Sequence, residues 1–253
     1  KAYLNGASRV NYRSMLNYVR THVDGKIICK GAIDSVVPQR RYLLIHSNLD
    51  NPDDEEVGFQ SVAEYESYLD KHNIKLNGSH IILTGAMGSP YELCAALENA
   101  GHTAYILPNV NAQADMDILD SIAPSAIVNF AHGRMGDAMV RYLEHTNIPL
   151  FCPLNVNTLT EEWLADKQGM QGGFLSQSLV VPEVDGAIRP YVLFAQRMND
   201  DGLREVYAIP DRLETFVKTI QGYINLKQKK NSEKKIAIVY FGNPLQNTLS
   251  AAG

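Results

Sequence analysis

The chain has 253 residues, of which 45% are hydrophobic, and it carries a formal net charge of −5 with an isoelectric point near 5.8. This length is enough for one large folded domain, or for one domain and part of another. The acidic balance provides no broad basic face, which argues against nucleic acid as a partner. No apolar run reaches the ~18 residues that a membrane-spanning helix requires, so we expect no membrane span.

The first residue is Lys1, and no signal-peptide pattern follows it. We therefore expect an internal fragment or a processed form, from which targeting signals can be missing. Cys29, Cys94 and Cys152 are far apart and odd in number, so they predict neither a disulfide framework nor a Cys-x-x-Cys zinc site. Reduced cysteines fit a cytoplasmic location.

The N-terminal part of the chain, residues 1–38, is predicted to be helical. Apolar residues recur at helical spacing over residues 9–23. A strand follows at residues 41–47, and the acidic stretch after it reads as a solvated loop. Ser61, with Glu64 three residues later, is a capping box that starts the next helix.

Strands then alternate with helices along residues 39–155, at the spacing of βαβ units. Ser89 and Glu92 form a second capping box, with proline at the first helical position. The pattern predicts an α/β fold with a doubly wound, mostly parallel sheet of the flavodoxin or Rossmann type. The expected strands are 80–85, 103–108, 126–131 and 149–154, and the helices between them are 61–72, 89–100, 114–122 and 136–146.

Residues 156–230 are predicted to form a small β-rich extension with a long helix that packs back on it. We expect a short helix at 160–170, a turn-like stretch at 171–177, and a long helix capped by Asp211 with Glu214 as its partner. The expected strands are 178–184, 187–197 and 204–210, joined by hairpin turns at Asp185-Gly186 and at residues 200–202. Residues 231–253 read as a linker and the first strand, 236–242, of a second, truncated α/β domain.

Ligands bind open parallel sheets outside the carboxyl ends of the strands, so the polar residues at those ends are the candidate site. His132 follows an apolar strand directly and is succeeded by Gly133 and Gly136, which let a backbone approach closely. Arg134 adds a guanidinium fork suited to carboxylates or phosphates. The other candidates are His46-Ser47-Asn48, the Thr84–Ser89 loop, Asn109, Cys152 and Asn155.

Each candidate also has a purely structural interpretation. His46 is compatible with a ligand or acid/base role and equally with a locally bonded residue at a strand end. Glu183 and Asp185 flank a turn, where an aspartate before glycine is ordinary turn chemistry. No nucleophile arrangement and no cluster of His, Cys and carboxylates with close metal-ligand spacing is visible in the sequence. The residues alone therefore predict an α/β domain with a small-molecule cleft.

Three stretches resemble the large subunit of cobaltochelatase and magnesium chelatase, the CobN/magnesium-chelatase H family. They are IPLFCPLNVNTLTEEWLADKQGM (148–170), SLVVPEVDGAIRPYVLFAQR (178–197) and KKIAIVYFGNP (234–244). Upstream, YLLIHSN looks like the family's strand ending in His-Pro, with Ser47 in place of the proline. The chain looks closest to a Bacteroidetes-type branch, some members of which are associated with haem uptake.

The resemblance implies a much larger parent enzyme, which inserts cobalt or magnesium into a tetrapyrrole or removes iron from haem. Separate AAA+ subunits hydrolyse ATP, so the chain itself needs no cofactor; its substrates are the tetrapyrrole and the divalent metal ion. His132, Arg134, Glu183 and Asp185 are the expected tetrapyrrole-binding residues, and His132 and His46 the expected metal ligands. The catalytic carboxylates are expected downstream of Gly253, so that this chain alone is inactive. The alternative is a non-catalytic scaffold that docks the AAA+ subunits.

Overall fold

The computed structural model describes residues 2–5, 9–26, 42–51, 56–85, 89–108, 110, 113–131 and 133–238. The chain divides into two compact units, residues 1–43 and 44–253. The first unit contains helices α1 (Ala2–Asn5) and α2 (Arg9–His22), so the predicted N-terminal helix is confirmed.

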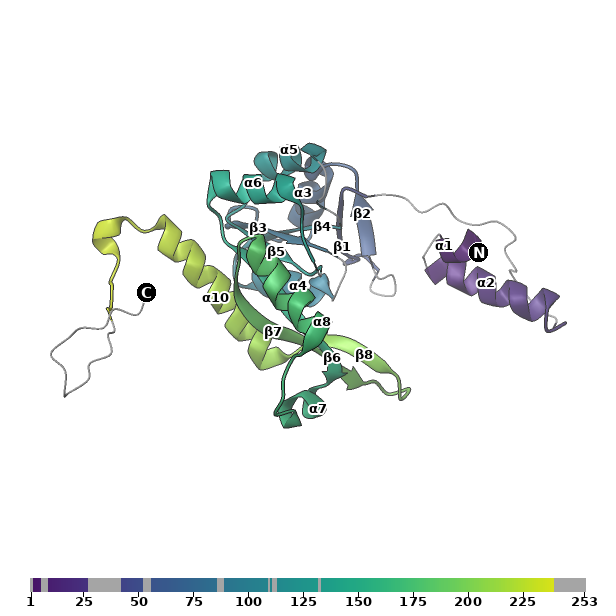
Figure 1. Ribbon diagram of the computed structural model, residues 1–253. Coiled ribbons are helices and arrows are strands. Elements are labelled where there is room, and N and C mark those ends of the chain that lie inside the picture. The colour runs from purple at the N-terminus through teal and green to yellow at the C-terminus, as the bar shows by residue number, and fades with distance from the viewer. Residues whose placement is uncertain are drawn as a thin grey trace. The chain divides into compact units, whose positions relative to one another are not determined.

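The second unit is built around one eight-stranded sheet with the order β2-β1-β4-β3-β5-β6-β7-β8 (Figure 1). The run β4-β3-β5-β6-β7 is parallel throughout. The predicted fold class, a mostly parallel α/β sheet, is therefore confirmed. The strands are β1 (Leu44–Ser47), β2 (Glu56–Phe59), β3 (His80–Thr84), β4 (Thr103–Leu107), β5 (Ala126–Asn129), β6 (Leu150–Leu159), β7 (Ala187–Met198) and β8 (Arg204–Ala208).

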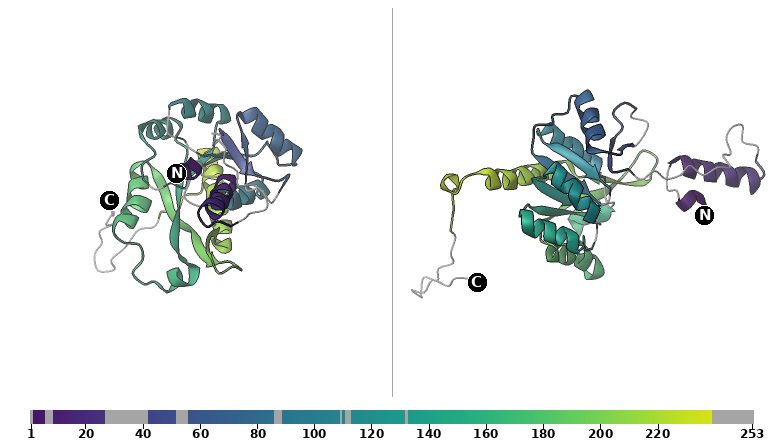
Figure 2. Two further views of the ribbon diagram at one scale, coloured as in Figure 1. Left: turned by 90° about the vertical axis from the view of Figure 1, so that its right-hand side faces the viewer. Right: turned by 90° about the horizontal axis from the view of Figure 1, so that it is seen from above.

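Helices cover both faces of this sheet (Figure 1). On one face, α4 and α10 pack against the strands and share one core with them, which includes Leu93, Leu97, Phe216 and Ile220. Figure 1 shows α3, α5 and α6 on the other face, and Figure 2 shows that the last turns of α10 extend past the sheet. The helices of this unit are α3 (Val62–Lys71), α4 (Pro90–Asn99), α5 (Gln113–Ile122), α6 (Asp137–Thr146), α7 (Thr160–Ala165), α8 (Gly172–Leu175), the π-helix η1 (Ser176–Val180), α9 (Val181–Val184), α10 (Pro210–Gln228) and the 3₁₀-helix η2 (Asn231–Glu233).

The first strand of the sheet runs opposite to the direction that we expected. β1 pairs antiparallel with β4, and it also forms an antiparallel hairpin with β2. The acidic stretch predicted as a loop therefore contains a short edge strand, in which Phe59 is buried. Because β1 is reversed, His46 lies toward the amino edge of the parallel strands and not at their carboxyl ends.

Residues 178–184, predicted as a strand, are helical and belong to η1 and α9. β6 and β7 are parallel, and parallel neighbours need a crossover connection, which is usually helical. The segment α7-α8-η1-α9 provides that crossover, and it also makes residues 172–175 helical where a turn was predicted. Valine prefers strands, but this preference is weak and does not outweigh the need for a crossover between β6 and β7. Asp185-Gly186 ends α9 with Gly186 at φ +92°, whereas the hairpin at residues 200–202 is confirmed between β7 and β8.

Two of the three predicted caps differ from the structure. Ser61 caps α3 and accepts a hydrogen bond from the Glu64 amide. Ser89 precedes α4 without a side-chain bond, and the Glu92 carboxylate accepts the Ala208 amide instead, at 2.6 Å. α10 begins at Pro210, so Asp211 lies inside its first turn and is not the cap.

The C-terminal linker is described only as far as residue 238. After η2, residues 234–238 have no regular secondary structure, and Ile236 and Ile238 are exposed. The remainder of the predicted strand 236–242 lies outside the described residues.

Candidate functional site

The order β4-β3-β5-β6-β7 reverses its direction of progression between β3 and β5. In such sheets the crevice at the carboxyl ends of these two strands is the usual ligand site. Thr84 ends β3 and Asn129 ends β5, and both side chains are buried. The Asn129 Oδ1 accepts the Ala131 amide at 3.0 Å, and the Asn129 side chain also interacts with the thiol of Cys152.

Cys152 lies beside Asn129 at this edge. Burial raises the pKa of the Cys152 thiol to about 12, and the Asn129 amide lowers it only in part. The thiol is therefore neutral at physiological pH, and its role as a nucleophile is disfavoured because the thiolate is the reactive form.

Gly85 lets the backbone after β3 and the backbone after β5 approach each other closely at this edge of the sheet. A Cβ at residue 85 would lie 2.5 Å from the Ala131 nitrogen and 2.8 Å from Asn129 Oδ1, and the glycine has φ +92°. We expect Gly85→Ala to lower the free energy of unfolding by about 2 kcal/mol or more, because it combines a left-handed backbone with overpacking. Urea denaturation followed by circular dichroism measures this. Gly101→Ala is the matched control, with φ +89° but open space around the new Cβ; equal losses in the two variants would contradict the close approach.

Arg134 and Asp185 form the predicted site's clearest interaction. The Arg134 Nε donates to Asp185 Oδ1, and the Met135 amide donates to Asp185 Oδ2 at 2.6 Å. The Asp185 side chain is 1% exposed and Arg134 is 47% exposed. Asp185 is thus a positioning residue that fixes the Arg134 loop, while the outer guanidinium nitrogens face solvent within reach of Asp137.

The structure gives less information about the other two residues predicted to bind a tetrapyrrole, Glu183 and His132. Glu183 lies on α9 with its side chain exposed, two residues before the buried Asp185. His132 lies outside the described residues. The adjacent Gly133 amide donates to the carbonyl of Gln177 at 3.2 Å, so the Arg134 loop is attached to the crossover segment at two places.

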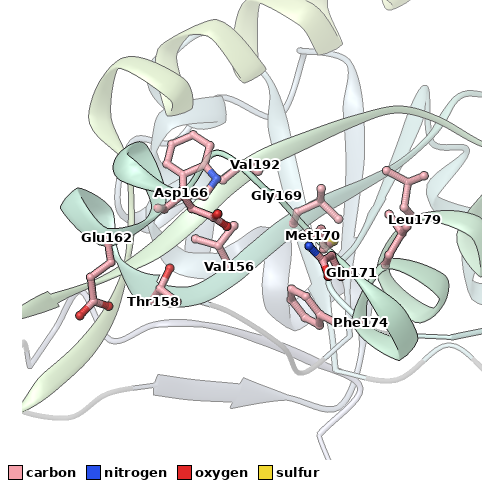
Figure 3. A pocket seen from close by; sticks show the side chains of 13 residues that line it. Val156, Thr158, Glu162, Asp166, Gly169, Met170, Gln171, Phe174, Leu179 and Val192 are labelled. Carbon is pink, nitrogen blue, oxygen red and sulfur yellow. The ribbon is translucent and has the colours of Figure 1, made fainter.

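The same crossover segment closes a cavity of about 370 Å³ beside the carboxyl-terminal half of β6 (Figure 3). In Figure 3, Thr158 and Glu162 lie at one end of the cavity and Phe174 and Leu179 at the other. Aliphatic, aromatic and thioether side chains dominate the lining, with carboxylates at Glu162 and Asp166. The lining residues are Leu154, Val156, Thr158, Glu162, Trp163, Asp166, Gly169, Met170, Gln171, Phe174, Leu175, Leu179 and Val192.

Trp163 is the only tryptophan of the chain, and its ring in the wall of this cavity makes a cation–π contact with Arg212. The Arg212 guanidinium lies 5.1 Å from the Trp163 ring and 4.2 Å from the ring of Tyr191. Arg212 also donates from Nε to the Val192 carbonyl. A charged group clamped between two aromatic faces orders this wall of the cavity.

His46 lies away from the Trp163 cavity and the Arg134 loop, because β1 runs antiparallel to its neighbour β4. It is buried beside α4, where its Nε2 lies 3.1 Å from Glu98 Oε1 and 3.7 Å from Cys94 Sγ. The structure therefore does not bring His46 to the Arg134 loop, contrary to the expectation from the sequence.

Sequence reasoning did not identify the cavity. Trp163 was part of a recognised motif, but the apolar residues around it come from separate elements, among them β6, α7 and α8. Because these residues are far apart in the sequence, no local pattern shows that they face the same cavity. Met170 ends the segment predicted as a short helix, and Phe174 stands in the stretch predicted as turn-like, where no helical periodicity was visible.

A family model described as CobN/Magnesium Chelatase matches residues 1–253. The chain belongs to this family. Among its relatives, a magnesium-chelatase subunit of Rhodobacter capsulatus is 29% identical over 146 residues, covering 51% of this chain and 12% of the relative. The chloroplastic magnesium-chelatase subunit ChlH of Oryza sativa subsp. indica is 28% identical over 188 residues, covering 67% of this chain and 13% of the relative.

The fold agrees with that of a solved family structure, the catalytic subunit of cobaltochelatase from Mycobacterium tuberculosis. The TM-score is 0.61 at 18% identity, over 92% of this chain and 20% of that subunit. The aligned part of this CobN/magnesium-chelatase chain corresponds to 9–13% of the length of the curated relatives. Within its described residues, no helix is long and apolar enough to cross a bilayer.

Proposed function

We propose that this chain forms part of the tetrapyrrole-binding cleft of a chelatase large subunit, with the Trp163 cavity receiving one edge of the macrocycle. The observation that carries the proposal is the cavity itself. Its volume of about 370 Å³ and its largely apolar lining are typical of small-molecule sites. A flat aromatic macrocycle with charged side chains matches apolar walls beside a small number of polar groups.

The Arg134 loop supplies the charged partner in this proposal. A guanidinium that is held by Asp185 and half exposed presents its remaining donors to a tetrapyrrole carboxylate, the geometry in which arginine binds carboxylates best. Glu183 is exposed at the same end of the crossover and would meet the metal or solvent side of the ligand. His132 would join them from the same loop as a metal ligand.

The chemistry of the whole protein extends this proposal. Insertion of cobalt or magnesium requires a base for two pyrrole protons and ligands that strip water from the metal; removal of iron from haem requires an acid instead. Glu162 and Asp166 line the cavity, but Glu162 already accepts the Leu159 amide and a hydrogen bond from Arg204. We therefore assign proton transfer to residues beyond this chain, and ATP hydrolysis to AAA+ subunits.

Trp163 reports directly on the proposed binding. Titration of the chain with a metal-free porphyrin or with haem is expected to quench Trp163 fluorescence and shift the Soret band, with one ligand bound per chain. Phe174→Ala removes apolar contact and is expected to weaken affinity about tenfold, and Arg134→Gln about fivefold to tenfold. Arg141→Gln, an exposed arginine on α6, is the matched control and should leave the affinity unchanged.

The same titration separates the two candidate functions. If neither tryptophan quenching nor a Soret shift develops at tens of micromolar ligand, the cleft proposal is wrong and the scaffold that docks AAA+ subunits is favoured. Quenching that is unaltered in both Phe174→Ala and Arg134→Gln would place the ligand elsewhere on the chain.

A further inference from the structure

Three side chains with metal-binding atoms converge near the amino edge of the parallel strands, away from the proposed cleft. His46 comes from β1, and Cys94 and Glu98 come from successive turns of α4. His46 and Cys94 are each 2% exposed, and the Glu98 side chain is 9% exposed. One ligand atom from each residue lies within 4.8 Å of the other two.

Both ring nitrogens of His46 lie beside oxygen atoms that accept hydrogen bonds. Nδ1 lies 2.9 Å from the Ser47 carbonyl oxygen. A carbonyl only accepts, so Nδ1 donates in this contact. Nε2 lies 3.1 Å from Glu98 Oε1, so without a metal ion a proton lies between these two atoms, and a bound cation would take its place. Metal-ligating histidines are oriented by this same kind of Nδ1–H bond to a carbonyl.

The distances between the ligand atoms match a tetrahedral centre. Typical zinc bond lengths place sulfur about 3.5 Å from the nitrogen or oxygen ligand of a tetrahedron, and nitrogen about 3.3 Å from oxygen. In the structure, Cys94 Sγ lies 3.7 Å from His46 Nε2 and 3.5 Å from Glu98 Oε1, and the nitrogen–oxygen separation is 3.1 Å. The three side chains therefore need almost no rearrangement to hold one ion.

The cluster also has an open side. A cavity of about 570 Å³ is lined by His46, Ser47 and Glu98 among other residues, so that solvent and a hydrated ion reach the carboxylate. Three protein ligands and an accessible fourth position are the arrangement of open zinc sites, in which water completes the tetrahedron.

We propose that His46, Cys94 and Glu98 bind a divalent transition metal of the Zn²⁺ class, with a water molecule from the cavity as the fourth ligand. A mixed nitrogen, sulfur and oxygen donor set suits Zn²⁺ and Co²⁺ and does not suit Mg²⁺, which requires oxygen ligands. The site ties strand β1 to α4 and is distinct from the proposed tetrapyrrole cleft.

Metal binding must displace the Cys94 proton. Burial, together with the neighbouring Glu98 carboxylate, raises the pKa of this thiol well above its ordinary value, so the metal-free thiol is protonated. The Cys94 S–H bond breaks, the proton leaves to solvent through the cavity, and the sulfur lone pair forms the metal bond. The proton between His46 Nε2 and Glu98 Oε1 is displaced to solvent in the same way, so two protons are released per ion bound.

Cobalt is the probe that tests this site, because a thiolate ligand gives Co²⁺ an intense near-ultraviolet charge-transfer band. The full 253-residue chain, reduced and treated with chelator, is expected to bind one Co²⁺ with that band and with visible bands of tetrahedral intensity. Zn²⁺ should displace the cobalt. Cys94→Ser should abolish the charge-transfer band, and Glu98→Gln should weaken Co²⁺ binding at least about tenfold, since even outer-shell changes cost that much.

A chain in which Cys94 is the only thiol is the matched control. The variant with both Cys29→Ser and Cys152→Ser should keep the full cobalt spectrum, with folding checked by circular dichroism. A band that persists in Cys94→Ser, or its absence from the unsubstituted chain at millimolar Co²⁺, would overturn the proposal. The second outcome identifies the cluster as a buried histidine–carboxylate ion pair. Because the porphyrin titration reads Trp163, failure of either proposal is distinguishable from failure of the other.

Discussion

Asp185→Ala is expected to lower the free energy of unfolding by about 3 kcal/mol and to release the Arg134 loop. The carboxylate is buried and accepts from both Arg134 Nε and the Met135 amide. Hydrogen bonds to charged groups contribute about 1.5–3 kcal/mol each. We use the lower end of this range because Arg134 is half exposed, so that water hydrates its guanidinium when the Asp185 carboxylate is removed.

The measurement is urea denaturation of the variant beside the unsubstituted chain, together with the porphyrin titration. We expect the variant to bind porphyrin at least as weakly as Arg134→Gln, because the guanidinium is then no longer oriented. Glu183→Gln, an exposed carboxylate two residues earlier, should change the free energy of unfolding by less than about 0.5 kcal/mol. If Asp185→Ala were as mild as this control, Asp185 would not position the loop.

Phe216→Ala is expected to have the largest effect on stability, a loss of about 3–5 kcal/mol. Phe216 is 1% exposed in the core between α10 and the sheet. Its ring centroid lies 5.9 Å from that of Phe151 in an edge-on contact and 5.8 Å from that of Tyr191 in a stacked one. Removal of the ring leaves a cavity lined by groups that belong to three different elements and that relax only in part.

Thermal and urea unfolding of Phe216→Ala measure this loss. Leu226→Ala is the matched control on the same helix, since Leu226 is 53% exposed where α10 extends past the sheet. A loss below about 1 kcal/mol for Phe216→Ala would mean that α10 does not share the sheet's core.

The elements that the sequence predicted well are those whose pattern is local. Residues 80–84 and 126–129 are short apolar runs bounded by turn residues, and they form buried parallel strands. The direction of β1 was predicted wrongly, because direction depends on its pairing with Ile106, about 60 residues away. The valines of 178–184 were misread because the demand for a crossover between β6 and β7 is a property of the finished sheet.

The candidate site shows the same division. The Arg134 loop was found from its glycines and from its place after a strand, but its partner Asp185 lies 51 residues later and was interpreted as a turn residue or a ligand. The partners of His46 lie 48 and 52 residues away, and no ligand spacing in the sequence reveals them. Chain topology brings these groups together, and local sequence patterns do not predict contacts between residues that are so far apart in the chain.

The strands at the two margins of the sheet have a consequence for self-association. β2 and β8 end the strand order of the described sheet, and they are four and five residues long. β8 carries the exposed Arg204 and the half-buried Glu205, and β2 begins with the exposed Glu56. Short, charged margins are poor templates for the addition of another strand, so intermolecular β-pairing and fibre growth are disfavoured at both borders of this open sheet.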